Sequence, residues 1–104
     1  MIIYNVTVKI DTEIHKDWLQ WMKTVHIPDV MKTGKFTNFQ IARVISNDEA
    51  DGISYAVQYK CPDMKTLHQY TIHDAPTLQK EHMERYEGKF VAFRTLLEVI
   101  DGTE

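Results

Sequence analysis

Histidines are the residues of this sequence that could move a proton or bind a metal near neutral pH. His26 stands in the segment VHIPDV, two residues before Pro28, where a helix should end. There it could project into a pocket as a base or a ligand, or it could cap the last carbonyl groups of the helix. We predict the capping role and keep the chemical role as an alternative.

Three further histidines follow in the second half of the chain, namely His68, His73 and His82. None of them lies four residues from another, whereas zinc ligands are usually more closely spaced. We therefore predict no metal site, and no other cofactor. His82 shares a helical stripe with Leu78 and Tyr86, which predicts a hydrogen-bonded histidine in the core.

Two charged residues and one cysteine complete the candidates for chemistry. Arg94 and Glu98 lie on one face of the last predicted strand, where they could hold a ligand or pair across the axis of a dimer. We predict the pairing. Cys61 has no base beside it in the sequence and no second cysteine to join, so it indicates neither a nucleophile nor a disulfide.

Composition predicts one globular domain over residues 1–104, of which 43% are hydrophobic and 26% are charged. The net charge of -3 and the scattered basic residues argue against nucleic acid as a partner. No apolar run approaches the roughly 20 residues that span a bilayer, so no membrane partner is predicted. The lone cysteine and the strand-like N-terminus favour a cytoplasmic protein over a secreted one.

Hydrophobic periodicity predicts four strands and two helical regions in the order βαββαβ. Alternation of apolar and polar residues marks the strands, at residues 2–10, 36–45, 53–60 and 89–100. The first helical region should end before Pro28, because proline has no N–H to donate, and a short helix should follow over residues 29–32. The second should begin after Asp63, break at residues 74–76 and end near residue 87.

This order predicts an α+β fold of the ferredoxin-like type, with a four-stranded antiparallel sheet and both helical regions on one face. One face of every strand is apolar, and we assign it to the helices. The opposite faces carry amides, small residues and a few aliphatic ones, where a solvated face would carry Lys and Glu. A second copy of the chain would cover that face, so we predict a homodimer. The candidate dimer face is Asn5, Gln40, Gln58, Arg94 and Glu98.

Aromatic and histidine side chains near the helices could line a pocket for a small apolar ligand. The candidate pocket residues are Trp18, Trp21, His26, His73, His82 and Tyr86. Tyr55, Tyr59 and Tyr70 could contribute as well, although aromatic residues at such spacing more often fill a core. A cavity of several hundred cubic ångströms between the two tryptophans and the second helical region would support a ligand.

Three stretches make nearly the whole chain resemble a small family of bacterial proteins of unknown function: MIIYNVTVKI, WLQWM…HIPDVMKTGKF and FVAFRTLLEVI. That family lies in the dimeric α/β-barrel superfamily, which includes antibiotic-biosynthesis-type monooxygenases and haem-degrading enzymes. The resemblance implies the ferredoxin-like fold and a homodimer. It implies no reaction, because a shared fold does not transmit function.

Haem-degrading members of the superfamily place a strand asparagine, a tryptophan and a helical histidine around the haem. Here Trp18 and Trp21 fall on the first helix, and Asn5 should face away from the helices. We therefore do not expect a haem site.

Two functions follow from these patterns. The first is a small-molecule-binding or scaffold protein with a pocket between helices and sheet. The alternative is a cofactor-free, monooxygenase-like enzyme in which His26, His73 or His82 carries a proton. A solvent-accessible pocket containing a histidine of shifted pKa would favour the enzyme, and a filled core would favour the scaffold.

Overall fold

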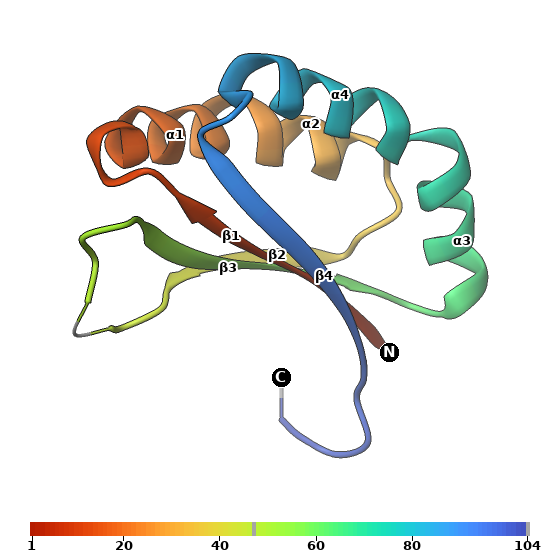
Figure 1. Cartoon of the computed structure of the whole chain (residues 1–104). Coiled ribbons are helices and arrows are strands. Elements are labelled where there is room, and N and C mark those ends of the chain that lie inside the picture. Colours follow the sequence, from red (N-terminus) through yellow and green to blue (C-terminus); the bar gives the residue numbers. More distant parts are fainter. Residues whose placement is uncertain (47, 104) are drawn as a thin grey trace.

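The chain folds as one antiparallel sheet with all of its helices packed on one face (Figure 1). The structure is a computed structural model and describes residues 1–46 and 48–103. Its strands and helical regions follow each other in the order βαββαβ, so the predicted ferredoxin-like fold is confirmed.

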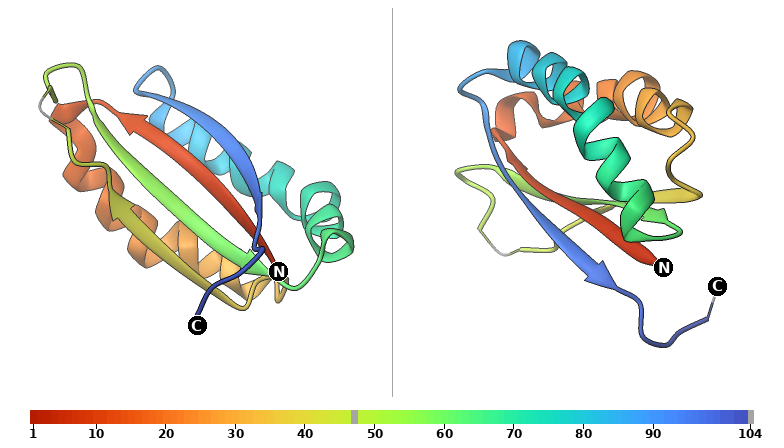
Figure 2. Two further views of the ribbon diagram at one scale, coloured as in Figure 1. Left: turned by 90° about the horizontal axis from the view of Figure 1, so that it is seen from below. Right: turned by 90° about the vertical axis from the view of Figure 1, so that its right-hand side faces the viewer.

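The four strands lie in the order β2-β3-β1-β4, with β1 and β3 at the centre (Figure 2). Their bounds are β1 (Ile2–Ile10), β2 (Asn38–Arg43), β3 (Ile53–Cys61) and β4 (Phe90–Glu98). The two edge strands are a few residues shorter than their alternation predicts. The central strands have alternating side chains, with one face buried under the helices.

The first helical region is continuous and does not break at Pro28, contrary to the prediction. Its parts follow without a gap: a 3₁₀ turn (Thr12–Ile14), α1 (His15–Trp21), a π-helical stretch (Met22–His26) and α2 (Ile27–Lys32). In the π-helical stretch the N–H of Ile27 donates to the carbonyl of Met22, five residues back. The wider turn accommodates Pro28, which lacks an N–H and whose ring would clash with the carbonyl four residues back in an ordinary α-helix.

The second helical region breaks where it was predicted to break, into α3 (Met64–His73) and α4 (Ala75–Tyr86). Asp63 caps α3, because its Oδ1 accepts a hydrogen bond of 2.8 Å from the N–H of Thr66. Pro76 lies in the first turn of α4, where the missing N–H is harmless. The inward stripe of α4 is buried as predicted and consists of Ala75, Leu78, His82 and Tyr86.

Trp18 joins the first helical region to the sheet and to α4. Its side chain is fully buried, and its ring centre lies 5.0 Å from that of Tyr55 on β3. Its Nε1–H donates a hydrogen bond of 2.9 Å to Nε2 of His82 on α4. The sheet and both helical regions therefore meet at this one side chain.

The register of β4 contradicts the prediction that Arg94 and Glu98 share a face with Asn5. Arg94 pairs with Val6 and Glu98 with Ile2, so both charged residues lie on the helix side of the sheet. Asn5 pairs with Thr95 on β4 and with Gln58 on β3, on the opposite side.

The misassignment has a physical cause in the composition of β4. The strand is apolar on both faces, with Phe90 and Ala92 on one side and Val91 and Phe93 on the other. Alternation alone then cannot show which face the helices cover, and a shift of one residue exchanges the faces. The hydrogen-bonded pairing with β1 shows which face of β4 lies under the helices.

We expect Trp18→Ala to lower the free energy of unfolding by about 3–5 kcal/mol, because it leaves a cavity where the sheet and both helical regions meet. Val25→Ala, on the exposed side of the same helical region, should lower it by less than about 1 kcal/mol. Urea denaturation of both variants measures the difference. Similar losses in the two would show that Trp18 does not organise the core.

Candidate functional site

A cavity of about 400 Å³ lies between the sheet and the helices. β1, β3 and β4 supply its floor, and the π-helical stretch, α2, α3 and α4 supply its roof. Most of the lining side chains are aliphatic or aromatic, including Val8, Met22 and Leu78. The site is therefore an apolar chamber with a small number of polar groups in its walls.

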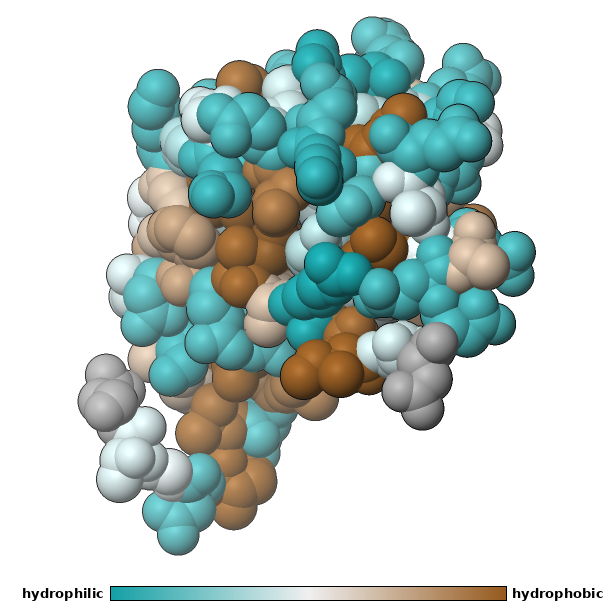
Figure 3. Space-filling model, turned by 90° about the vertical axis from the view of Figure 1, so that its left-hand side faces the viewer, coloured by the Kyte–Doolittle hydropathy of each residue, from teal (hydrophilic) through white to brown (hydrophobic). Residues whose placement is uncertain are grey.

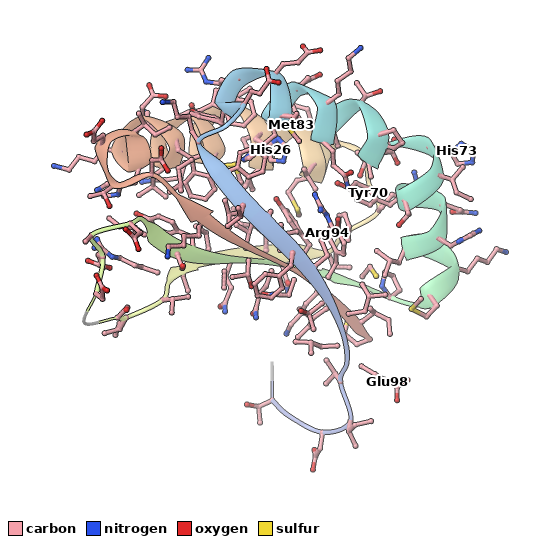
Figure 4. The ribbon with its side chains drawn as sticks, in the orientation of Figure 1. His26, Tyr70, His73, Met83, Arg94 and Glu98 are labelled. Atoms are coloured by element: carbon pink, nitrogen blue, oxygen red, sulfur yellow. The ribbon has the colours of Figure 1, made fainter. Side chains whose placement is uncertain are left out.

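Of the six candidate pocket residues, His26 and His82 line this cavity. Trp18, Trp21 and Tyr86 lie behind the wall; the ring centre of Trp21 is 5.1 Å from that of His26. His73 is exposed, and Figure 4 shows it on the outer side of α3, away from the cavity. The cavity is thus displaced from the two tryptophans, toward the middle of the sheet.

Two further polar residues line the cavity: Tyr4, which sequence reasoning missed, and Arg94, which it placed on the opposite face of the sheet. Nε of Arg94 donates a hydrogen bond of 2.9 Å to the hydroxyl oxygen of Tyr4. Tyr4 gave a sequence signal, because a side chain with a polar tip stood in the apolar face of the first strand. Arg94 was recognised as a residue that could hold a ligand, but it was assigned to the dimer face, because the two apolar faces of β4 do not show which one the helices cover.

His82 is held as a neutral hydrogen-bond acceptor. Its Nε2 accepts from the indole of Trp18, so its own proton must be on Nδ1. Burial, assisted by the nearby His26 and Arg94, lowers the pKa of His82 to about 4. The prediction of a hydrogen-bonded core histidine agrees with this contact.

His26 is a second neutral histidine, and its surroundings differ from those predicted. The helix continues through residue 26, so there are no terminal carbonyl groups for it to cap. Its Nδ1 is buried with no hydrogen-bond partner among the described residues. Burial lowers the pKa of His26 to about 4, with Asp29 opposing the shift and Arg94 adding to it. At neutral pH this ring can accept a proton or a hydrogen bond.

The tyrosines at the other end of the cavity remain protonated. Burial raises the pKa values of Tyr59 and Tyr70 well above that of free tyrosine. Their rings pack around Phe36, with centres 5.1 Å and 4.7 Å from the Phe36 ring, respectively. They supply apolar surface and hydroxyl groups, and no negative charge.

Three of the candidate dimer-face residues do lie on the bare face of the sheet. Asn5, Gln40 and Gln58 share that face, where Nε2 of Gln40 donates a hydrogen bond of 3.1 Å to Oε1 of Gln58. Nδ2 of Asn5 donates a hydrogen bond of 3.0 Å to the hydroxyl oxygen of Thr7, its neighbour on the same face. Asn5 thus faces away from the cavity, as predicted.

Residues 1–46 and 48–103 contain no cluster of three or more His, Cys, Asp or Glu that could hold a metal ion. Over the same ranges no helix is long and apolar enough to cross a membrane. The polar groups available for chemistry in the cavity are therefore two neutral histidines, several hydroxyl groups, one amide and one guanidinium.

A family model described as "Domain of unknown function (DUF4286)" matches residues 1–100. A comparison with curated proteins gave no significant match. Solved structures with low sequence identity share the fold. HapK from Hahella chejuensis is 11% identical with a TM-score of 0.75, and the match covers 100% of this chain and 97% of that one.

Two other solved structures extend the comparison. A dimeric ferredoxin-like protein from an uncultured marine organism is 12% identical with a TM-score of 0.72, over 100% of this chain and 99% of that one. A Bacillus cereus protein provisionally assigned as an antibiotic-biosynthesis monooxygenase is 9% identical with a TM-score of 0.69, and the match covers 99% of this chain and 96% of that one. At these identities the likeness is one of fold.

We expect the fold to lose stability in acid because of its buried histidines. The folded pKa of His82, about 4, lies below the ordinary value of 6.5, so the unfolded chain takes up a proton first as the pH falls. The free energy of unfolding should therefore decrease between about pH 6.5 and pH 4, by roughly 3 kcal/mol for His82 alone. Urea denaturation at about pH 7 and about pH 4.5 measures this loss.

His82→Gln keeps a hydrogen-bond acceptor near Trp18 but cannot titrate, so it should lose less stability than the wild type between the two pH values. His68→Gln, at an exposed position on α3, should lose as much as the wild type. If His82→Gln and His68→Gln lose the same amount, the acid sensitivity does not come from the buried ring.

Proposed function

The chain belongs to the family of the domain of unknown function DUF4286, and we propose that it is a homodimer that binds a small apolar molecule between its helices and its sheet. The cavity of about 400 Å³ supports this proposal, because its volume lies within the range of small-molecule sites. Its apolar walls with a few converging polar groups also have the composition of such sites.

The way the interior is filled favours a ligand-binding function over a purely structural function. Protein interiors are close-packed, and voids left in them lower stability in proportion to their volume. The chain nevertheless keeps this space between the sheet and the helices, where larger side chains at Val8 or Leu78 would close it. A cavity retained in this way is better explained by an occupant than by packing.

The homodimer is supported by the composition of the bare face. Val91, Phe93 and Leu97 leave 66%, 62% and 40% of their surface exposed on that side of β4. Among the described residues the strand positions of this face include no carboxylate, and their two cations, Lys9 and Lys60, stand near opposite ends. A face of apolar, small and amide side chains without charge at its centre is typical of an interface.

The exposed apolar surface continues beyond the end of the sheet. Figure 3 shows brown, apolar residues running down one side of the molecule into the part that projects below its body. Val99 and Ile100 follow β4 directly, and Ile100 leaves 84% of its surface exposed. A second copy of the chain could cover this segment together with the bare face. The dimeric ferredoxin-like protein of similar fold adds support for this assembly.

A second candidate function is a cofactor-free, monooxygenase-like enzyme, for which His26 is the candidate base. Its ring lines the cavity and is neutral at pH 7, and because a pKa near 4 makes it a weak base, it would take a proton only from a strongly acidic C–H group of a substrate. The resulting carbanion would react with dioxygen, and a CH₂ group would become C=O with release of water. Recovery of the ligand unchanged in air would favour binding, and recovery of a ketone would favour the enzyme.

The cavity should bind N-phenyl-1-naphthylamine, an uncharged probe that fluoresces when it leaves water. Leu78→Trp fills the cavity from α4 and should weaken binding by about tenfold or more, because the probe loses its apolar contacts. Ile72→Trp, at an exposed position on α3, adds the same indole outside the cavity and should leave the affinity unchanged. A probe that binds Leu78→Trp as tightly as the wild type does not sit in this cavity.

Phe93→Glu should convert the dimer into a monomer, because it places a charge at the centre of the apolar part of the bare face. Sedimentation velocity at micromolar concentrations measures the assembly. Ile72→Glu puts the same charge on the helix side of the molecule and should leave the dimer intact. A wild type that sediments as a monomer would overturn the proposed assembly.

A further inference from the structure

The cavity contains one permanent charge. Arg94 is the only Lys, Arg, Asp or Glu among its lining residues. His26 and His82 are neutral at pH 7, since their pKa values lie near 4. Within the described residues no carboxylate lies at ion-pair distance from Arg94. Arg94 is exposed and lines the cavity, and a guanidinium without a carboxylate partner can pair there with a negatively charged ligand.

The hydrogen bonds of Arg94 leave its outer donors available. Nε is taken by the hydroxyl oxygen of Tyr4, at 2.9 Å, which fixes the plane of the guanidinium. The two terminal nitrogens make no hydrogen bond to any described residue. Figure 4 shows this side chain rising from β4 toward the helices, on the side where His26, Tyr70 and Met83 lie. Two parallel N–H groups of this kind match the two oxygens of a carboxylate.

Tyr4 adds a third donor at the same place. Its hydroxyl oxygen accepts from Arg94, so its own proton is free to donate, and no acceptor for it lies within hydrogen-bond distance among the described residues. Its ring stands edge-on to that of Tyr70, with the centres 5.8 Å apart. Tyr4 therefore supplies both a hydrogen-bond donor and part of the aromatic wall.

The opposite wall of the cavity is also aromatic. The rings of His82 and Phe90 meet edge-on with their centres 4.4 Å apart, and the ring of His26 lies 5.7 Å from that of His82. Aromatic rings pack favourably against the edges and faces of a flat aromatic ligand. The walls thus suit a planar ring, and the guanidinium suits a single negative charge attached to it.

We propose that the ligand of this cavity is an aromatic carboxylate, whose oxygens pair with Arg94 and the Tyr4 hydroxyl while its ring lies between Tyr70 and His26. This inference rests on the proposed small-molecule-binding function and names the class of molecule bound. A monoanion is favoured over a phosphate ester, because one guanidinium balances one charge and an excess charge in an apolar cavity would be unpaired.

The test compares 2-naphthoate with 2-naphthamide, which has nearly the same size and shape but no charge. Isothermal titration calorimetry at about pH 7 should show that the wild type binds naphthoate about tenfold or more tightly than naphthamide, the amount expected for hydrogen bonds to a charged group. Arg94→Gln should lose this preference and keep its affinity for naphthamide. Arg85→Gln, a surface change on α4, should keep the preference.

Tyr4→Phe tests the same site without touching the charge. It should weaken naphthoate binding severalfold and leave naphthamide unaffected, because only the hydroxyl donor is removed. Equal binding of the two compounds by the wild type, or a preference that survives in Arg94→Gln, would overturn the anion site while leaving the pocket in place. Failure of the wild type to bind either compound would overturn the binding function together with the ligand class.

Discussion

The pairing of β4 with β1 is the constraint on which the rest of the structure depends. With Val6 opposite Arg94, the guanidinium enters the space under the helices and Phe93 faces away from them. A shift of one residue would exchange these positions, and would place a charge on the bare face and a phenyl ring in the cavity. The cavity and the proposed interface are therefore two consequences of one register.

The helix side of the sheet combines stable packing with groups that packing alone does not need. Trp18 and His82, far apart in the sequence, form a buried hydrogen bond that fixes a neutral imidazole. His26, by contrast, leaves a buried nitrogen without a partner among the described residues, and the exposed Arg94 leaves its two terminal nitrogens unpaired beside the same cavity. A buried polar atom without a partner lowers stability, and an unpaired guanidinium at a cavity can bind a ligand.

The sequence predicted the fold well because β1, β2 and β3 alternate and the signals that begin and end helices are local. Asp63 and the break near Pro76 were placed correctly, since capping and proline effects act within one turn. Pro28 was misjudged, because a π-helical turn can absorb a proline without ending the helix. The sequence predicted that a cavity could lie between helices and sheet, but it did not predict which residues line it. Arg94 enters the cavity only because β4 pairs with β1, and the two apolar faces of β4 do not reveal that pairing.

Solution NMR can measure that pairing directly. Nuclear Overhauser effects are expected between the Arg94 side chain and the Tyr4 ring on the helix side, and between the Phe93 ring and Thr7 on the bare side. Contacts from Arg94 to Asn5 or Thr7 in their place would mean that β4 is shifted by one residue. That result would remove the guanidinium from the cavity and contradict the account of both faces.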